Sequence, residues 1–253
     1  ADIVMLDDNL MVHNTWLGGQ LMVENQKITT LLDEQLSNRR YAYPKKAYQS
    51  IKLPKNINFT PTIPKKNNFK INVIKTELPG IVTIQELIEI HKKPNSWNEI
   101  LSLHNLCHLC VIERHGKNGE FAHGFIKNFN LTKGAVASSV GHDAHNIIVA
   151  GINEEDMKFA VDLINEYQGG MVIVNNGKLI SKVLLPIAGL LSDKKANEIA
   201  DENQSFKENW KKSGCTLAFM GFNLLSLSVI PNLRLTNKGL VEVRKMKIIP
   251  LFE

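Results

Sequence analysis

A strand, a helix and a hairpin follow one another between residues 147 and 185, and this succession leaves few possible folds. The β-branched run at residues 147–149 is typical of a buried strand. Asn153 is a suitable N-cap, the acidic residues after it complement the helix dipole, and Gly169-Gly170 can end the helix. Between these limits, apolar residues recur at helical spacing: Met157, Ala160, Val161 and Ile164. We therefore expect a helix with one face packed on a sheet.

The hairpin is predicted after this helix. Residues 175–178 read Asn-Asn-Gly-Lys between the apolar runs 171–174 and 179–185, and Asn and Gly tolerate the left-handed backbone of a tight turn. The expected fold class is α+β, with mixed or antiparallel sheets packed with a few helices. The other expected elements are strands at 69–74, 106–114, 224–230 and 239–252, and a helix from a Ser192 cap to Gly214.

One segment favours two different structures. Thr83 and Glu86 have the spacing of a capping box, which argues for a helix over residues 80–90. The same residues contain a β-branched run, which argues for a strand. The sequence alone leaves both open.

Composition divides the chain into three parts. Residues 1–36 form a first part, typical of short strands up to about Ile28, residues 37–68 an extended Lys- and Pro-rich connection, and residues 69–253 the main α+β domain. The connection carries much of the net charge of +5, with aromatic residues between its cations. These cations are Arg39, Arg40, Lys45, Lys46, Lys52, Lys55, Lys65 and Lys66, and Lys70 follows just after the connection. Because four prolines interrupt the segment, we expect solvated charge rather than a nucleic-acid site.

Membrane and disulfide-stabilised classes are not expected. No apolar run reaches the roughly 18 residues needed to cross a bilayer, and the first residues lack the pattern of a signal peptide. The three cysteines, Cys107, Cys110 and Cys215, are too few for a disulfide framework. The expected location is the cytoplasm.

The stretch from Gly134 to Asn146 combines small residues with reactive side chains. Its glycines, alanines and serines leave room for another body to approach the backbone. His142, Asp143, His145 and Asn146 offer proton-transfer and hydrogen-bonding groups. Because a strand follows at once, we expect this polar cluster at the mouth of a sheet.

Several spaced segments carry a resemblance to a known family. They are Glu113–Gly119, Gly124–Lys127, Ser138–Asn146, Gly151–Met157 and Leu185–Leu190. Together they resemble the C-terminal region of bacterial and archaeal adenine deaminases, which are members of the amidohydrolase superfamily. The resemblance extends from Ala1–Asp8, which is similar to the chain leaving that family's metal-binding barrel, to Val229–Thr236 and the end of the chain.

The resemblance implies a metal-dependent hydrolase of which this chain is one portion. Amidohydrolases bind their metal through a His-x-His pair and further barrel ligands, and none of the eight histidines here forms such a pair. The chain also has no room for a barrel of about 250 residues. We therefore expect manganese, iron or zinc in a barrel elsewhere in a longer enzyme, and no metal on this chain. Adenine, that barrel and further copies of the same protein are the expected partners, and residues 1–36 would belong to a β-sandwich beside the barrel.

By the same resemblance, individual residues receive roles in the deamination of adenine to hypoxanthine and ammonia. His142 and Asp143 are expected to act as acid, base or hydrogen-bonding groups facing the substrate. Ser138, Ser139, His145 and Asn146 are expected to shape the pocket and bind substrate. Lys127 would hold the loop or a polar ligand.

Other interpretations of these residues stay open. Cys107-His108-Leu109-Cys110 imitates a zinc site, although a strand would point the two cysteines to opposite faces. His142 and His145 could instead bind a metal, and a Ser138 or Ser139 nucleophile could be activated by His142. The polar cluster could also be a tight turn with a purely structural role. The whole chain could serve as a non-catalytic scaffold, ligand-binding or oligomerisation module of the same fold.

Overall fold

The computed structural model describes residues 1–38, 43–77 and 81–253, which form two compact units, Ala1–Pro44 and Lys45–Glu253. The cations Arg39 and Arg40 of the expected connection, and Gly80 of the ambiguous segment, lie outside the described residues. Among the described residues, no helix is both long and apolar enough to cross a membrane.

The first unit is a four-stranded antiparallel sheet followed by one helix. Its elements are β1 (Ile3–Leu6), β2 (Val12–Leu17), β3 (Gln20–Glu24), β4 (Lys27–Ile28) and α1 (Thr30–Asn38). The prediction of short strands here is confirmed. Met22 is the single buried side chain among this unit's described residues, and the apolar side chains of β1 are exposed.

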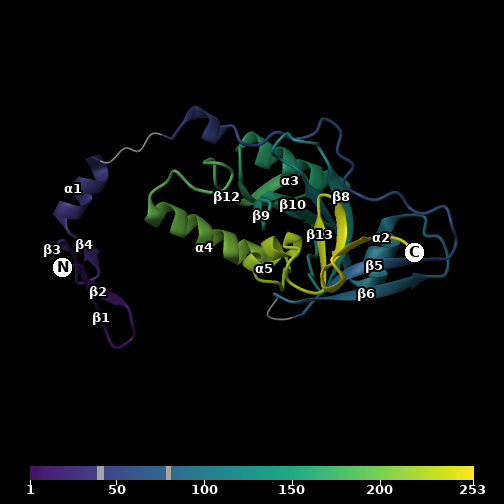
Figure 1. The fold of residues 1–253 in the computed structure, drawn as a ribbon, viewed down its shortest axis with the longest axis horizontal. Coiled ribbons are helices and arrows are strands. Elements are labelled where there is room, and N and C mark those ends of the chain that lie inside the picture. The colour runs from purple at the N-terminus through teal and green to yellow at the C-terminus, as the bar shows by residue number, and fades with distance from the viewer. Residues whose placement is uncertain (39–42, 78–80) are drawn as a thin grey trace. The chain divides into compact units, whose positions relative to one another are not determined.

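An eight-stranded sheet forms the centre of the second unit (Figure 1). Its order is β12-β11-β9-β10-β7-β8-β5-β6, and every neighbouring pair is antiparallel except β5 and β8. The strands are β5 (Phe69–Thr76), β6 (Thr83–Ile90), β7 (Leu106–Ile112), β8 (Phe121–Lys127), β9 (Ala135–Gly141), β10 (Asn146–Gly151), β11 (Gly170–Asn175) and β12 (Lys178–Leu184). The central strands β7, β9 and β10 are almost wholly buried, so both faces of the sheet must be covered.

Helices α2 (Trp97–His104) and α3 (Glu154–Glu166) cover one face. The apolar side of α3 packs on Ala135, Ala137, Ile147 and Val149, and α2 packs through Trp97 on the β5 end of the sheet. Residues 45–68, which begin with the 3₁₀ helix η1 (Lys45–Tyr48), bury Ile51 and Phe59 against the α3 cluster.

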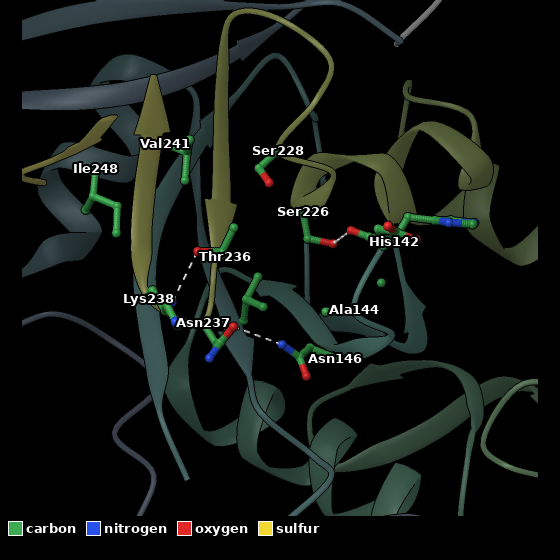
Figure 2. A pocket seen from close by; sticks show the side chains of 13 residues that line it. His142, Ala144, Asn146, Ser226, Ser228, Thr236, Asn237, Lys238, Val241 and Ile248 are labelled. Atoms are coloured by element: carbon green, nitrogen blue, oxygen red, sulfur yellow. Dashed lines mark hydrogen bonds between the residues drawn. The ribbon is translucent and has the colours of Figure 1, made fainter. Parts of the chain in front are cut away.

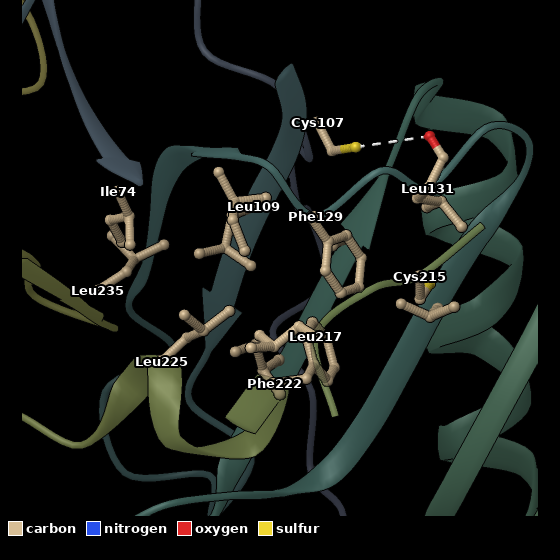
Figure 3. Packing of buried hydrophobic residues seen from close by; sticks show 14 of the residues in the cluster. Ile74, Cys107, Leu109, Phe129, Leu131, Cys215, Leu217, Phe222, Leu225 and Leu235 are labelled. Atoms are coloured by element: carbon tan, nitrogen blue, oxygen red, sulfur yellow. Dashed lines mark hydrogen bonds between the residues drawn. The ribbon is translucent and has the colours of Figure 1, made fainter. Parts of the chain in front are cut away.

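The other face is covered by the C-terminal part of the chain. Its elements are α4 (Ala196–Lys212), α5 (Phe219–Asn223), η2 (Leu224–Ser226), β13 (Leu233–Thr236), β14 (Gly239–Glu242), η3 (Val243–Lys245) and β15 (Lys247–Ile249). The last three strands form a separate antiparallel sheet. Figure 3 shows how Phe222, Leu225 and Leu235 from this layer meet Ile74 and Leu109 of the large sheet. The core is therefore divided between the two faces.

The expected α+β class is confirmed, and so are most of the local predictions. The Asn153 side chain caps α3 by accepting from the Asp156 amide at 2.7 Å, and residues 175–178 form the β11–β12 turn. The ambiguous segment forms strand β6.

Two local predictions are wrong. Helix α4 begins at Ala196, and the hydroxyl of Ser192 accepts from the Lys194 amide before the helix starts. Residues 224–230 form η2 and a turn rather than a strand, because the fully buried Arg234 guanidinium binds the Leu224 and Ile230 carbonyls and bends this segment around itself. The closing strands are β13, β14 and β15, and η3 interrupts the expected run at 239–252.

Candidate functional site

The polar stretch of the sequence forms the turn between β9 and β10, at one end of the large sheet. His142 and His145 are half-buried, whereas Asp143 and Ala144 are exposed. His145 has a φ of 52°, in the left-handed region. Such a backbone is uncommon for a residue with a side chain and is maintained by surrounding contacts.

The C-terminal layer holds one side of this turn. The His142 amide donates to the Asn223 carbonyl at 3.0 Å. The Ser226 hydroxyl donates to the His142 carbonyl at 2.5 Å. Both partners lie at the α5–η2 junction, so the packing of that junction on the sheet fixes the start of the turn.

The segment after β7 holds the other side. The Arg114 Nε donates to the His145 carbonyl at 2.5 Å, and the His115 Nε2 lies 2.8 Å from the Ala144 carbonyl oxygen. Of the four turn residues His142–His145, three have a bound backbone carbonyl, and Asp143 is the exception. The backbone of the turn is fixed by side chains from two distant parts of the chain.

In contrast, the side chains of His142 and Asp143 have no hydrogen bond or ion pair with any described residue. The His142 imidazole lies beside that of His145, with ring centroids 5.5 Å apart. Burial lowers the pKa of His145, the nearby His142 and Arg114 act in the same direction, and Asp143 opposes them. His145 is therefore held toward its neutral form near pH 7.

A cavity of about 470 Å³ lies between this turn and the β13–β14 hairpin (Figure 2). Its lining is contributed by Val111, Gly141, His142, Asp143, Ala144, Asn146, Ser226, Ser228, Thr236, Asn237, Lys238, Val241 and Ile248. Val111, Val241 and Ile248 contribute apolar surface, and polar side chains of the turn and the hairpin contribute most of the rest. The exposed polar groups of the turn therefore border a cavity that is open to solvent.

Amide side chains cross one wall of the cavity. The Asn146 Nδ2 donates to the Asn237 Oδ1 at 3.1 Å, and the Asn237 Nδ2 donates to the Glu120 Oε2 at 3.0 Å. The Asn146 Oδ1 is buried without a hydrogen-bond partner. An amide in this position retains hydrogen-bonding capacity for a ligand or a further chain.

The other residues singled out from the sequence lie away from the cavity. Ser138 and Ser139 are fully buried in β9. The Ser139 hydroxyl donates to the Gly189 carbonyl at 2.6 Å and accepts from the Gly170 amide at 2.9 Å. Lys127 forms an ion pair with Glu86. The buried serines cannot meet a substrate in this arrangement, which removes the geometry that a serine nucleophile requires.

The suggested zinc site at Cys107 and Cys110 is not assembled. The two thiols point to opposite faces of β7, Cys107 into the cluster beneath α4 and Cys110 into the cluster beneath α3. Burial raises the pKa of Cys107 to about 12 and also raises that of Cys110, which disfavours the thiolate that binds metal. Across the described residues, no three His, Cys, Asp or Glu side chains converge as ligands.

Sequence reasoning missed half of the cavity. Ser226 and Asn237 lie 84 and 91 residues from the turn residues that they bind. The Asn237-Lys238 pair in the tight β13–β14 turn was the available signal, but nothing local connects it to His142. The cavity exists only because the C-terminal layer folds back over the sheet.

Comparison with known proteins identifies relatives across the whole chain. The model of the adenine deaminase C-terminal domain matches residues 81–247. An adenine deaminase from Chelativorans is 54% identical over 254 aligned residues, and one from Clostridium botulinum is 34% identical over 259. Both alignments include 100% of this chain but 42% of the relative, so the chain spans less than half the length of the relatives it matches.

Proposed function

Because the chain belongs to the adenine deaminase C-terminal domain family, we propose that it is the C-terminal portion of an enzyme that hydrolyses adenine to hypoxanthine and ammonia. The observation that carries the proposal is the contrast within the β9–β10 turn. Its backbone is bound on both sides, while the side chains of His142 and Asp143 make no hydrogen bond or ion pair with a described residue at the edge of a cavity. A turn built only for structure would not need to present these two groups.

His142 and Asp143 carry the chemical part of the proposal. Deamination at C6 requires a proton for the leaving amino group and hydrogen bonds to the purine nitrogens. An imidazole can donate or accept such a proton, and a neighbouring carboxylate can accept a hydrogen bond from the ring or amino group. Activation of the attacking water is assigned to manganese, iron or zinc held by the rest of the enzyme.

The remaining site residues support these two. Asn146 offers an amide to the purine edge from the cavity wall. His145 lies against His142, and Ser138 and Ser139 hold β9 behind the turn. Lys127, bound to Glu86, would act at most on the loops around the site.

The setting of the enzyme is also part of the proposal. We place it in the cytoplasm, in purine salvage, with its barrel and additional copies as partners. The three cysteines support a reducing compartment, since all are buried and unpaired. The exposed apolar strands of the first unit support a covering sheet in the complete enzyme.

The test combines this chain with the remaining length that its relatives carry. Ammonia and hypoxanthine are measured with adenine as substrate in the presence of manganese, iron or zinc. His142→Ala and Asp143→Asn should each lower kcat by about 10²-fold or more, the usual contribution of a positioned acid or base. His91→Ala is the control, because His91 is exposed in a loop outside the cavity and should leave kcat unchanged.

The scaffold hypothesis predicts a different result. If both variants keep full activity while the chain is still needed for assembly, the chain acts as a non-catalytic module. If the complete protein releases no ammonia from adenine with any of the three metals, the proposed reaction is wrong.

A further inference from the structure

Arg114 is a buried cation without a carboxylate partner among the described residues. It is 1% exposed and lies two residues after the end of β7. Its guanidinium donates to the His145 carbonyl, to the Ala188 carbonyl at 3.0 Å and to the Ser50 hydroxyl at 3.3 Å. All three acceptors are neutral.

The adjacent carboxylate of Glu113 forms no ion pair or hydrogen bond with this guanidinium. Glu113 uses its two oxygens to accept from the backbone amides of His115, Lys117, Asn118 and Gly119. Burial lowers the pKa of Arg114 to about 10, and the nearby charge of Glu113 opposes this shift only in part. Removal of the guanidinium would leave the His145 and Ala188 carbonyls without their donor, so the arginine serves these two carbonyls rather than an ion pair.

The geometry around Arg114 is specific to a guanidinium. Gly189 has a φ of 72°, and a Cβ at that position would lie 2.8 Å from the Arg114 Nη1. The glycine therefore leaves the space that the planar group occupies. From there, Arg114 connects the His145 end of the turn to the Ala188–Gly189 segment, which Ser139 anchors to β9.

We propose that Arg114 is a positioning residue that sets the place of His142 and Asp143 by binding the carbonyl of His145. The inference rests on the proposed function of the turn. Arg114 does not line the cavity and touches no substrate in this arrangement. It acts through the backbone, opposite the Ser226 contact that holds the His142 carbonyl.

A shift of the turn by about 1 Å would reduce kcat by about 10²-fold, because acid–base groups act only within a narrow range of positions. The KM for adenine should change less than about threefold, since the cavity walls from β13 and β14 remain. Lysine cannot reproduce the effect, because a single ammonium lacks the fork that reaches three separated acceptors.

The experiment uses the complete enzyme with Arg114→Met, Arg114→Lys and Gly189→Ala. The third variant keeps the arginine but places a methyl group against its guanidinium. Gly177→Ala is its matched control, because Gly177 has a similar φ of 67° and open space around its Cβ. Thermal unfolding gives the folded fraction, and kcat and KM are expressed per folded molecule.

The expected result is a loss in kcat of about 10²-fold in both Arg114 variants and at least tenfold in Gly189→Ala, with the Gly177→Ala control at full kcat. A purely structural role predicts lower stability and unchanged kcat per folded molecule, and that result overturns the proposal. Failure of both Arg114→Lys and Gly189→Ala to fold also overturns it. If His142→Ala and Asp143→Asn are themselves fully active, the proposed function of the turn fails first.

Discussion

Replacing Ser139 with alanine separates a role in stability from a role in substrate binding. The hydroxyl lies in a fully buried position on β9, where it donates to the Gly189 carbonyl and accepts from the Gly170 amide. Alanine fits the space but removes both hydrogen bonds. The hole that it leaves is the size of one hydroxyl group, which is too small for a water molecule to replace it.

The expected loss follows from these two contacts. A buried polar group left without a partner costs about 1–3 kcal/mol, and a lost neutral hydrogen bond contributes about 1 kcal/mol net. We expect Ser139→Ala to lower the free energy of unfolding by about 2–4 kcal/mol. Ser138→Ala is the matched control, because Ser138 is equally buried but accepts only from the Val140 amide, at 3.1 Å, and should cost about 1 kcal/mol.

Urea unfolding followed by circular dichroism measures both losses, with an unchanged m-value as the sign that the unfolded state is the same. In the complete enzyme, kcat per folded molecule should stay within about threefold of the parent, because Arg114 and Ser226 still bind the carbonyls of the turn. A loss of stability no larger than that of Ser138→Ala would refute the reasoning. So would a large fall in kcat with stability intact, since it would place Ser139 in contact with substrate.

Three further predictions concern other parts of the second unit. Asn153→Ala should lower the free energy of unfolding by about 1 kcal/mol, because it removes the cap of α3, and an Asn153→Ser variant should recover most of it in thermal unfolding. Glu113→Gln should lower the free energy of unfolding by about 2 kcal/mol at pH 7. Burial raises the pKa of Glu113, but hydrogen bonds from four backbone amides outweigh burial and hold the pKa below its ordinary value. In urea unfolding, the parent's greater stability should therefore be complete above about pH 4.3 and should shrink as the pH falls through the lower folded-state pKa. All three cysteines should resist dithionitrobenzoate at about pH 8 in the folded chain and react once it is unfolded; a rapidly reacting thiol in the folded chain would contradict their burial.

Local patterns predicted the elements whose limits lie close together in the sequence. The α3 helix has its cap, acidic first turn and terminating glycines within a few residues of its own ends, and the β11–β12 turn contains its own Asn-Gly pair. Neither element depends on contacts with distant segments of the chain to be predicted. Helix α2 depends on a distant contact instead. Ser96 makes no side-chain hydrogen bond as its N-cap, and the Trp97 Nε1 donates to the distant Pro61 carbonyl.

Tertiary contacts determine the backbone conformation of the segment that was wrongly predicted as a strand. Residues 224–230 are apolar enough for a strand, but Arg234 binds two of their carbonyls and Leu225 enters the core. Hydrogen bonds from a buried arginine to backbone carbonyls do not appear in the hydrophobic periodicity of the sequence. The apolar run therefore indicated burial correctly and backbone conformation incorrectly.

The residues of the candidate site also divide into those that the sequence predicted and those that only tertiary contacts bring together. The placement of His142, Asp143 and Asn146 together follows from their closeness in one turn. The contacts of Glu113 and Arg114 were not predicted: the carboxylate accepts from backbone amides and the guanidinium donates to backbone carbonyls. Distant partners such as Asn237 could not be assigned, because a single sequence does not specify which hairpin closes over which turn.

The hydrogen bonds to the backbone carbonyls of the β9–β10 turn affect the entropy of ligand binding. The conformational entropy of this segment is already lost when the second unit folds, so a ligand that meets His142 and Asp143 does not have to freeze a flexible loop. Binding at such a preorganised surface should carry a small entropic penalty. The His142 amide, which donates to the Asn223 carbonyl, should exchange its hydrogen slowly before the ligand arrives as well as after.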